Sequence, residues 1–479
     1  MKRIVCWLLA FAACISMQAA KHETKVKFPG GKHYIYRYTL RDKQGTPYSL
    51  DKPQRWLSHK SIERRKRQGL ALDSTDLPVN PKYVKQFNTK RSIVIGTSRW
   101  QNTVLVRSND TLTLSQLGQL PCVSAAQLVW TSPDSIERGP VKWKTHESFN
   151  PYDSVKTEYY GNGKQQIEML KGHRLHAAGL RGQGMTIAIL DGGFCNADRI
   201  PALSKADIVG ARDFVCPVLT ENIGGMDQNP AGTLYYETEH GTKVLSCMAA
   251  NAPTVLVGTA PEAHYWLLRC EDQQTEQPVE EDYWTIAAEF ADSVGADIIS
   301  SSLGYNEYDA PNTSYRLGDL DGHTAFISRT ASMLAGKGIV LVNSAGNTGM
   351  GPWKKICVPA DAHDILTVGA LTTTGQSAPF SSVGPTQDNR VKPDIMALGS
   401  PAALISGRGT LVRDMGTSFS TPIVAGLVAC LWQDMRQKTA LDIINLIRES
   451  SDNYNTPNNI YGYGMPNFWR AYMVGKMKP

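Results

Sequence analysis

Residues 415–426 read MGTSFSTPIVAG, and the apolar run LVACLWQDM continues this segment to Met435. A hydroxyl-rich stretch that leads directly into a long apolar segment indicates that Ser418 lies at the beginning of a buried helix. Pro422 fits the first turn of such a helix, where a missing backbone N–H costs little. The free N–H groups and the positive dipole end would favour an anion that develops beside Ser418. The segment therefore predicts a helix terminus that is suited to chemistry.

The chain after Tyr160 alternates between apolar strands and helical runs. Strands are predicted at 185–190, 263–270, 297–303, 338–345 and 364–370, and helices at 240–251, 282–295 and 323–338. Strands that are apolar on both faces and alternate with helices are typical of a parallel sheet with helices on both faces. In such sheets, ligands bind outside the carboxyl ends of the strands. The predicted fold class is therefore α/β.

Composition excludes several classes of protein. Of the 479 residues, 42% are hydrophobic and 20% are charged, which is typical of a folded globular protein and not of a disordered or collagen-like chain. The formal net charge of +6 is too small and too scattered to indicate nucleic-acid binding. The nine cysteines form no CxxC pair, which argues against a zinc site with thiolate ligands.

The first twenty residues, MKRIVCWLLAFAACISMQAA, have the basic start, the short apolar run and the small final residues of an export signal. We expect cleavage near Ala20, and lipid attachment at Cys14 is the alternative. The protein is therefore expected to be exported, either secreted or held in the cell envelope. No segment is expected to span a membrane, because the first apolar run is short and 418–432 carries polar residues and a proline.

Residues 21–150 are predicted to form a small α+β unit and a polar linker, followed by a larger domain over 151–479. Strands are predicted at 34–40, 91–97, 102–108 and 123–130, and helices at 55–69 and 112–120. The basic cluster ERRKRQG (63–69) is interpreted as a solvated helical face, because runs of charge are usually solvated. A processing site for a basic-specific protease is the alternative.

Three short stretches place reactive side chains at the ends of strands or helices. ILDGGF places Asp191 after a strand, ETEHGTKV places His240 at the start of a helix, and MGTSFSTP does the same for Ser418. In nucleophilic hydrolases an imidazole removes the serine proton during attack, and a carboxylate fixes the tautomer of the imidazole and stabilises its charged form. Each residue alone is more often a cap, a turn or a structural histidine, so the combination carries the hypothesis.

In the order Asp, His, Ser, these stretches resemble the subtilase family of serine peptidases. The resemblance covers about 165–470 and rests on ILDGGF, EHGTKV, VGTAPEA, IISSSLG, NSAGN, SAPFSSVGP and MGTSFSTPIVAG. It implies a subtilisin-like fold and a secreted serine endopeptidase that cleaves peptide bonds through an acyl-enzyme intermediate. Asp191, His240 and Ser418 would be its catalytic triad.

The resemblance also implies roles for residues around the triad. The side-chain amide of Asn347 would hold the tetrahedral oxyanion together with the backbone N–H of Ser418. Extended peptides would bind by main-chain hydrogen bonds, as an added strand does. Two segments would line the pocket for the residue before the scissile bond, namely Ser302, Leu303, Gly304, Ser344, Ala345 and Gly346.

The chain departs from the family pattern in places. Gly192 follows Asp191 where the family usually carries Ser or Thr, and Phe419 is bulkier than the usual residue after the nucleophile. No cofactor is expected to be required. Calcium binding is possible, but the family's calcium ligands match no stretch here, so no metal ligands are assigned.

The N-terminal unit resembles the propeptide-inhibitor domains that precede secreted subtilases. That resemblance implies a ferredoxin-like βαββαβ domain that packs on the peptidase and acts as its intramolecular inhibitor. The alternative is a retained accessory domain. The expected partners are therefore protein or peptide substrates and the chain's own N-terminal domain. Nucleic acid is not expected to bind, and the sequence predicts no oligomeric state.

Two other functions are alternatives to the peptidase hypothesis. The first is a catalytically inactive subtilase-fold protein that binds peptides, which the presence of Asp191, His240, Asn347 and Ser418 together disfavours. The second is an α/β-hydrolase esterase. That fold requires a GxSxG elbow and the chain order Ser, Asp, His, whereas Ser418 comes last here.

Overall fold

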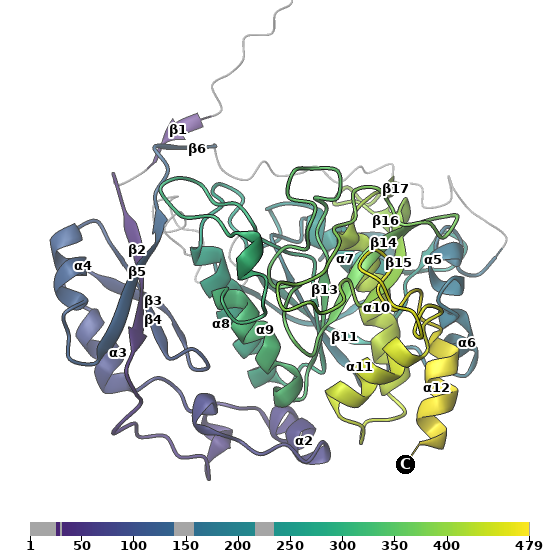
Figure 1. Ribbon diagram of the computed structural model, residues 1–479, viewed down its shortest axis with the longest axis horizontal. Coiled ribbons are helices and arrows are strands. Elements are labelled where there is room, and N and C mark those ends of the chain that lie inside the picture. The colour runs from purple at the N-terminus through teal and green to yellow at the C-terminus, as the bar shows by residue number, and fades with distance from the viewer. Residues whose placement is uncertain (1–24, 29–30, 138–157, 216–233, 479) are drawn as a thin grey trace, which may run out of the picture.

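The computed structural model describes residues 25–28, 31–137, 158–215 and 234–478 (Figure 1). Its centre is a seven-stranded parallel sheet with the strand order β15-β14-β13-β12-β7-β11-β8. The strands are β7 (Thr186–Asp191), β8 (Asp207–Asp213), β11 (His264–Arg269), β12 (Ile298–Ser301), β13 (Val340–Ser344), β14 (Leu366–Thr372) and β15 (Ile395–Ser400). This sheet confirms the predicted α/β fold class. The edge strands β8 and β15 were not predicted.

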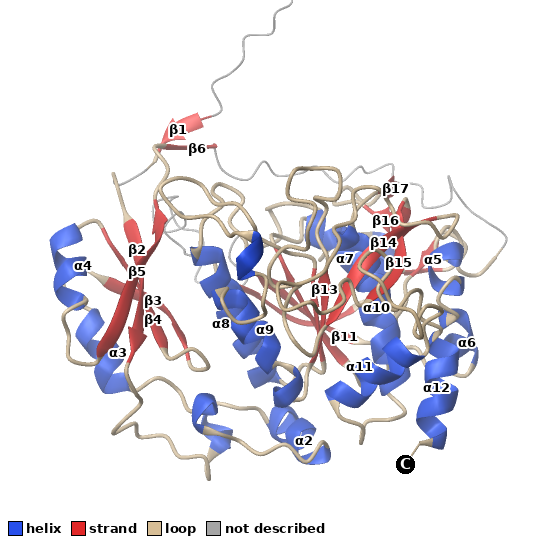
Figure 2. Ribbon diagram, viewed as in Figure 1, coloured by secondary structure: helices blue, strands red, loops and turns tan. Residues whose placement is uncertain are grey.

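Helices cover both faces of the parallel sheet (Figure 2). One face carries α7 (His240–Ala249), α10 (Thr417–Trp432), α11 (Ala440–Glu449) and α12 (Phe468–Met477), and the other carries α8 (Val279–Val294) and α9 (Phe326–Met333). Along β7, Ile187 and Ile189 pack towards α7 and α10, whereas Ala188 and Leu190 pack towards α8 and α9. Burial on both faces explains why the strands are continuously apolar in sequence.

Short elements complete the larger domain. Helices α5 (Lys164–Glu168) and α6 (Gly172–Ala177) precede β7. Two small antiparallel pairs join β9 (Asn251–Ala252) to β10 (Leu256–Val257), and β16 (Ala402–Ile405) to β17 (Leu411–Asp414). Outside the larger domain, within residues 21–150, a third pair joins β1 (Lys25–Lys27) to β6 (Ser135–Glu137). Within the described ranges, no helix combines the length and the apolar character that crossing a membrane requires.

The N-terminal unit is a four-stranded antiparallel sheet with the strand order β3-β4-β2-β5. Its strands are β2 (Tyr34–Leu40), β3 (Ile93–Ser98), β4 (Thr103–Ser108) and β5 (Val123–Thr131), and α3 (Pro81–Phe87) and α4 (Thr111–Leu117) cover one face. The other face packs on α8, as Figure 1 shows. The chain order β2-α3-β3-β4-α4-β5 agrees with the predicted ferredoxin-like arrangement.

An extra segment between β2 and α3 carries helix α2 (His59–Arg67), which begins after Ser58 and is followed by Gly69 in the left-handed conformation. This helix lies at the amino ends of the parallel strands. Arg64 donates to the carbonyl of Ala296, which precedes β12, and Gln68 donates to the carbonyl of Gly338, which precedes β13. The segment therefore fastens the N-terminal unit to the end of the sheet opposite to the strands' carboxyl ends.

The prediction that the basic cluster is solvated is wrong for Arg64 and Arg65, which are buried. Both pair with Asp292 of α8, and Arg65 and Arg99 lie 2.8 and 2.6 Å from its carboxylate oxygens. Burial opposes ionisation of Asp292, but the three guanidinium groups outweigh it and hold its pKa below the usual value. The basic cluster is thus partly an interdomain contact. Lys66, on the same helix, is exposed as predicted.

Removing the Asp292 charge tests this contact. In full-length protein carrying Ser418→Ala, we expect Asp292→Asn to lower the free energy of unfolding by about 3–5 kcal/mol, because three guanidinium groups, two of them buried, lose their shared anion. Urea denaturation measures the change. The matched control is Lys66→Ala, an exposed change that should stay within about 0.5 kcal/mol. Equal effects of the two variants would contradict the proposed role of the buried ion pairs.

Candidate active site

Asp191 and His240, predicted from separate motifs, are brought together at the carboxyl end of β7. Asp191 ends this strand and is 0% exposed, and His240 begins α7 with 32% of its side chain exposed. The Nδ1 atom of His240 lies 2.9 and 3.0 Å from the two carboxylate oxygens of Asp191. The backbone N–H of Gly192 donates to the same carboxylate at 2.8 Å. This contact keeps the proton on Nδ1 and leaves Nε2 as the atom that can accept another proton.

The charges around the imidazole favour its protonated form. Burial alone would lower the pKa of His240, but the charge and hydrogen bond of Asp191, together with the charge of Glu271, raise it to about 9. Lys243 acts in the opposite sense, although its own charge is paired with Glu239 at 2.8 Å and with Asp414 at 3.0 Å. The electrostatic potential at the His240 imidazole is therefore negative overall.

Ser418 is the second residue of α10 and is 8% exposed. Pro422 is the sixth residue of this helix, so its predicted place in the first turn is wrong. At this position proline removes the N–H that would bond to the carbonyl of Ser418. That carbonyl instead accepts a hydrogen bond from the hydroxyl of Ser302 at 2.8 Å. The proline thus leaves the Ser418 carbonyl without its helical partner, and Ser302, just after β12, bonds to this carbonyl instead.

Helices α7 and α10 pack together, which brings Phe419, the residue after Ser418, against His240. The ring of Phe419 lies 5.8 Å from the imidazole ring, centroid to centroid, and is tilted by 39°. The bulky residue after Ser418 therefore packs against the imidazole. The hydroxyl of Ser418 donates to the carbonyl of Ser302 at 3.4 Å, and in the described part of the chain no hydrogen bond joins it to His240. Such bonds are often long before a substrate binds.

Asn347 follows β13 and is held against the first residue of α10. Its Oδ1 atom accepts hydrogen bonds from the backbone N–H and the hydroxyl of Thr417, both at 2.9 Å. These two bonds fix the direction of the amide. Its Nδ2 donors make no hydrogen bond within the described residues, and the side chain is exposed. A free amide donor therefore lies beside the helix N-terminus that carries Ser418.

The two predicted pocket segments follow neighbouring strands and contact each other. The hydroxyl of Ser344 donates to the carbonyl of Leu303 at 3.5 Å, and the N–H of Gly346 donates to the hydroxyl of Thr417 at 3.3 Å. Gly346 has a φ of +106°, and a Cβ atom there would lie 2.9 Å from the sulfur of Cys357. A Cβ atom at Gly304 would lie 3.0 Å from the Cβ atom of the same cysteine. Cys357 therefore fills the space between the two segments.

Sequence reasoning missed Glu271, which lies close to the Asp191–His240 pair. It follows β11, and no motif marks it. A Cβ atom at Gly192 would lie 2.6 Å from the Oε2 atom of Glu271 and 2.6 Å from the Nε2 atom of Gln273. The departure from the family pattern at Gly192 was the available signal, because a missing side chain leaves room for another group.

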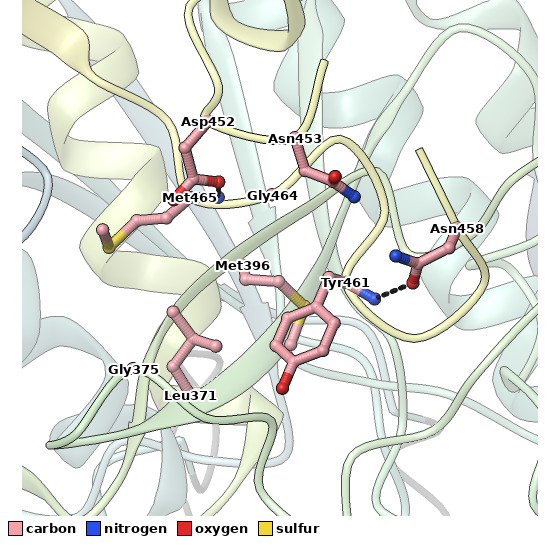
Figure 3. A pocket seen from close by; sticks show the side chains of 9 residues that line it. All are labelled: Leu371, Gly375, Met396, Asp452, Asn453, Asn458, Tyr461, Gly464 and Met465. Atoms are coloured by element: carbon pink, nitrogen blue, oxygen red, sulfur yellow. Dashed lines mark hydrogen bonds between the residues drawn. The ribbon is translucent and has the colours of Figure 1, made fainter. Parts of the chain in front are cut away.

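The structure supports no assignment of metal ligands. Over the described residues, no group of three or more His, Cys, Asp or Glu side chains is arranged to hold a metal ion, so we assign no calcium ligands. A pocket of about 390 Å³ lies elsewhere, between β14, β15 and the loop before α12 (Figure 3). Met396, Asp452 and Tyr461 are among its lining residues. None of the predicted site residues lines it.

Comparisons with known proteins find relatives of both domains. A model of the subtilase family matches residues 182–464, and a model of the peptidase S8 propeptide domain of Bacteroidota matches residues 35–145. Subtilisin NAT of Bacillus subtilis subsp. natto is 28% identical over 324 residues, which are 67% of this chain and 74% of that protein. An intracellular serine protease of Paenibacillus polymyxa is 30% identical over 288 residues, which are 59% and 77% of the two chains. The solved structure of the prenylagaramide maturation protease PagA is 22% identical, has a TM-score of 0.48 and covers 64% of this chain and 99% of its own.

The titration of His240 tests the field described above. We expect its imidazole to titrate near pH 9 by NMR, and we expect Asp191→Asn to lower that midpoint because burial then meets less opposition. Because the native pKa exceeds the reference value of about 6.5, the stabilisation is present below pH 6.5 and is lost as the pH rises through 9. His176, whose pKa is lowered to about 4 by burial, is the internal control and should not respond to Asp191→Asn. A wild-type midpoint at or below 6.5 would overturn this account.

Proposed function

Because the chain belongs to the subtilase family of serine peptidases, we propose that it is an endopeptidase with Asp191, His240 and Ser418 as its catalytic triad. The observation that carries this proposal is the buried Asp191 carboxylate on Nδ1 of an imidazole whose helix packs against the N-terminus of α10. Asn347, with its oriented amide beside the same terminus, supports an oxyanion role. The substrates would be proteins or peptides.

In the proposed mechanism, the hydroxyl of Ser418 turns from the Ser302 carbonyl towards Nε2 of His240. As Oγ attacks the peptide carbonyl, its proton passes to Nε2, and Asp191 stabilises the imidazolium. The oxyanion of the tetrahedral intermediate accepts hydrogen bonds from the N–H of Ser418 and from the Nδ2 donors of Asn347. The imidazolium then protonates the leaving amine as the C–N bond breaks. Water hydrolyses the resulting ester by the same steps.

We also propose that residues 21–150 comprise a propeptide domain and its linker, that 151–479 comprise the peptidase domain, and that the N-terminal domain inhibits the peptidase before release. The propeptide family match over 35–145 supports this division, as does the docking of the antiparallel sheet on α8. The bidentate pair of Arg37 with Asp282, at 2.7 and 2.6 Å, adds a second buried charge contact to that at Asp292. Contacts of this kind would hold the domain in place after the chain is cut.

The proposed localisation is export, with removal of residues 1–20. It rests on the sequence of these residues alone, which lie outside the described ranges. Lipid attachment at Cys14 is the alternative. Calcium binding is common among subtilases, and we propose no residue of this chain as a calcium ligand.

Replacing Ser418 tests the proposed chemistry. We expect Ser418→Ala to lower kcat for peptide hydrolysis by about 10⁶-fold, because the attacking oxygen is lost. A sulfonyl fluoride should label Ser418 in the wild-type protein, as mass spectrometry would show. The matched control is Ser420→Ala. It removes a hydroxyl whose one hydrogen bond among the described residues goes to the carbonyl of Thr417, and this variant should keep its activity. A wild-type protein that neither cleaves peptides nor reacts with the reagent would favour an inactive peptide-binding protein.

The termini of the exported protein test the domain proposal. We expect N-terminal sequencing of exported wild-type protein to find one chain that begins near Lys21 and a second that begins between 127 and 160. The Ser418→Ala protein should yield only the first, because cleavage between the domains would be its own reaction. A second chain in both proteins would assign that cut to another protease. A blocked N-terminus at Cys14 would indicate the lipid anchor.

A further inference from the structure

Glu271 occupies a place that the rest of the site leaves open for it. It is the second residue after β11, and the N–H of Cys270 donates to the carbonyl of Asp191 at 3.0 Å, so this loop starts beside the end of β7. The Oε2 atom of Glu271 accepts a hydrogen bond from Gln273 at 3.1 Å. A Cβ atom at Gly192 would lie 2.6 Å from each of these two side-chain ends, so both would have to move. Glycine at position 192 thus leaves space next to Asp191, and the carboxylate of Glu271 occupies that space.

Glu271 belongs to a group of acidic residues that form no ion pair within the described residues. We use the name acidic group for Glu271, Asp272, Glu276 and Asp309. Among the described residues, no Lys, Arg or His side chain lies within 4 Å of these four carboxylates in an ion pair. Arg269, the nearest arginine along the chain, lies 3.0 Å from Asp213 and 3.8 Å from Glu237 instead. All four residues are partly or fully exposed, so an external cation can reach them.

The missing cation has an electrostatic consequence. Burial and the charge of Asp191 raise the pKa of Glu271 to about 7, although the charges of His240 and Arg269 act in the opposite sense. Burial, together with Glu271, Asp309 and Asp272, raises the pKa of Glu276 to about 7 as well. Carboxylates paired with a cation usually show the opposite shift. The acidic group is therefore a place where a positive charge would be stabilised, in a chain whose net charge is +6.

A buried hydroxyl beside the acidic group also lacks a partner. Tyr305 is 1% exposed, and its hydroxyl makes no hydrogen bond within the described residues. The charges that act on this hydroxyl are those of Glu280, Glu271 and Glu276. An unmade hydrogen bond in a buried place is costly, so this hydroxyl points to a group that comes from outside the chain. At 1% exposure the hydroxyl has room for a small group such as a water molecule and lies out of reach of a substrate side chain, which would bind the partly exposed Glu271 instead.

The acidic group lies between the reacting residues and the pocket segments. At one end Glu271 borders Gly192, which follows Asp191. At the other end the N–H of Asp309 donates to the carbonyl of Glu276 at 2.8 Å, in the loop that follows Gly304. Cys357 contacts the positions of Gly304 and Gly346. A peptide that runs from the pocket segments to His240 therefore passes the acidic group.

We propose that Glu271 determines specificity by binding a lysine or arginine side chain of the substrate, on a residue close to the scissile bond. The proposal deepens the proposed function and rests on it. An ammonium or guanidinium group would complete the partly buried carboxylate with a charge-assisted hydrogen bond. The hydrogen bond from Gln273 holds the Glu271 carboxylate in the space beside Gly192, where the substrate cation would bind.

Peptide cleavage tests the proposal position by position. The substrates are a neutral quenched peptide and four derivatives, each with one lysine at a successive residue before the scissile bond. At pH 8.5, above the pKa of Glu271, we expect one derivative to exceed the neutral peptide in kcat/KM by about 10-fold or more. Below pH 7 the ratio should fall as Glu271 gains a proton. Because kcat/KM reports the protonation state of the free enzyme, protonation of His240 before binding affects both peptides alike, and the ratio isolates Glu271.

Two isosteric variants separate Glu271 from the rest of the acidic group. Glu271→Gln should bring the ratio close to 1, whereas Glu276→Gln, the matched control, should keep most of it. Loss of the ratio in Glu276→Gln with retention in Glu271→Gln would overturn the assignment, as would a wild-type ratio below 2 at every position. A merely structural role of Glu271 would change the two peptides equally.

A binding measurement keeps this test distinct from that of the proposed function. Fluorescence anisotropy with uncleavable product peptides gives the dissociation constants of the lysine and neutral forms for the wild-type and Glu271→Gln proteins. Tighter binding of the lysine form that depends on Glu271, without any cleavage, would support the recognition and reject the peptidase. Cleavage that depends on Ser418, with no preference for lysine in either assay, would reject Glu271 and leave the peptidase intact.

Discussion

The Asp191 carboxylate is a buried charge, and its cost constrains the rest of this structure. A carboxylate without solvent contact is tolerated only when it is paired and hydrogen-bonded. Here the imidazole of His240 and the N–H of Gly192 meet that need. The first lies at the start of α7 and the second just beyond β7, so this helix and this strand must meet at one point. Phe419 packs on the other side of the same ring and brings the start of α10 to it.

The same physics holds the two domains together. Asp282, Glu289 and Asp292 lie along one side of α8, and each is satisfied by groups of the N-terminal unit. Arg37, Arg99 and the helix α2 supply the cations, while the N–H groups of Arg99 and Trp100 bond to Glu289. The N-terminal unit both buries these three carboxylates and supplies their partners, so the cost of removing each charge from water is offset by a contact across the interface. The charges on this side of α8 are therefore complementary to the N-terminal unit.

The sequence predicted what depends on local pattern. The apolar strands around β7 and β12 were located to within a few residues because both faces of the sheet are buried. The helix starts at His240 and near Ser418 followed from the motifs. The edge strands β8 and β15 were missed, since neither carries a motif and β8 is not continuously buried. Their strand character comes from the neighbours β11 and β14.

What the sequence could not predict is how distant charges pair. Arg64 and Arg65 have the composition of a solvated surface, and only the approach of Asp292, more than 200 positions later, buries them. Pro422 could be assigned to a helix but not to its second turn, because the first helical residue depends on how Thr417 bonds to Asn347. Glu271 has no local signal. Its meaning depends on Gly192 and His240, which belong to other elements.

Charge also connects recognition to chemistry at this site. The free imidazole of His240 is held in its protonated form by Asp191 and Glu271, yet it must be neutral to accept the proton of Ser418. A substrate cation bound at Glu271 would cancel part of the negative field and lower the pKa of His240. The same contact that selects the peptide would then increase the fraction of neutral imidazole. Since Asp191 remains buried and bonded to Nδ1, the tautomer would not change, and only the availability of Nε2 would rise.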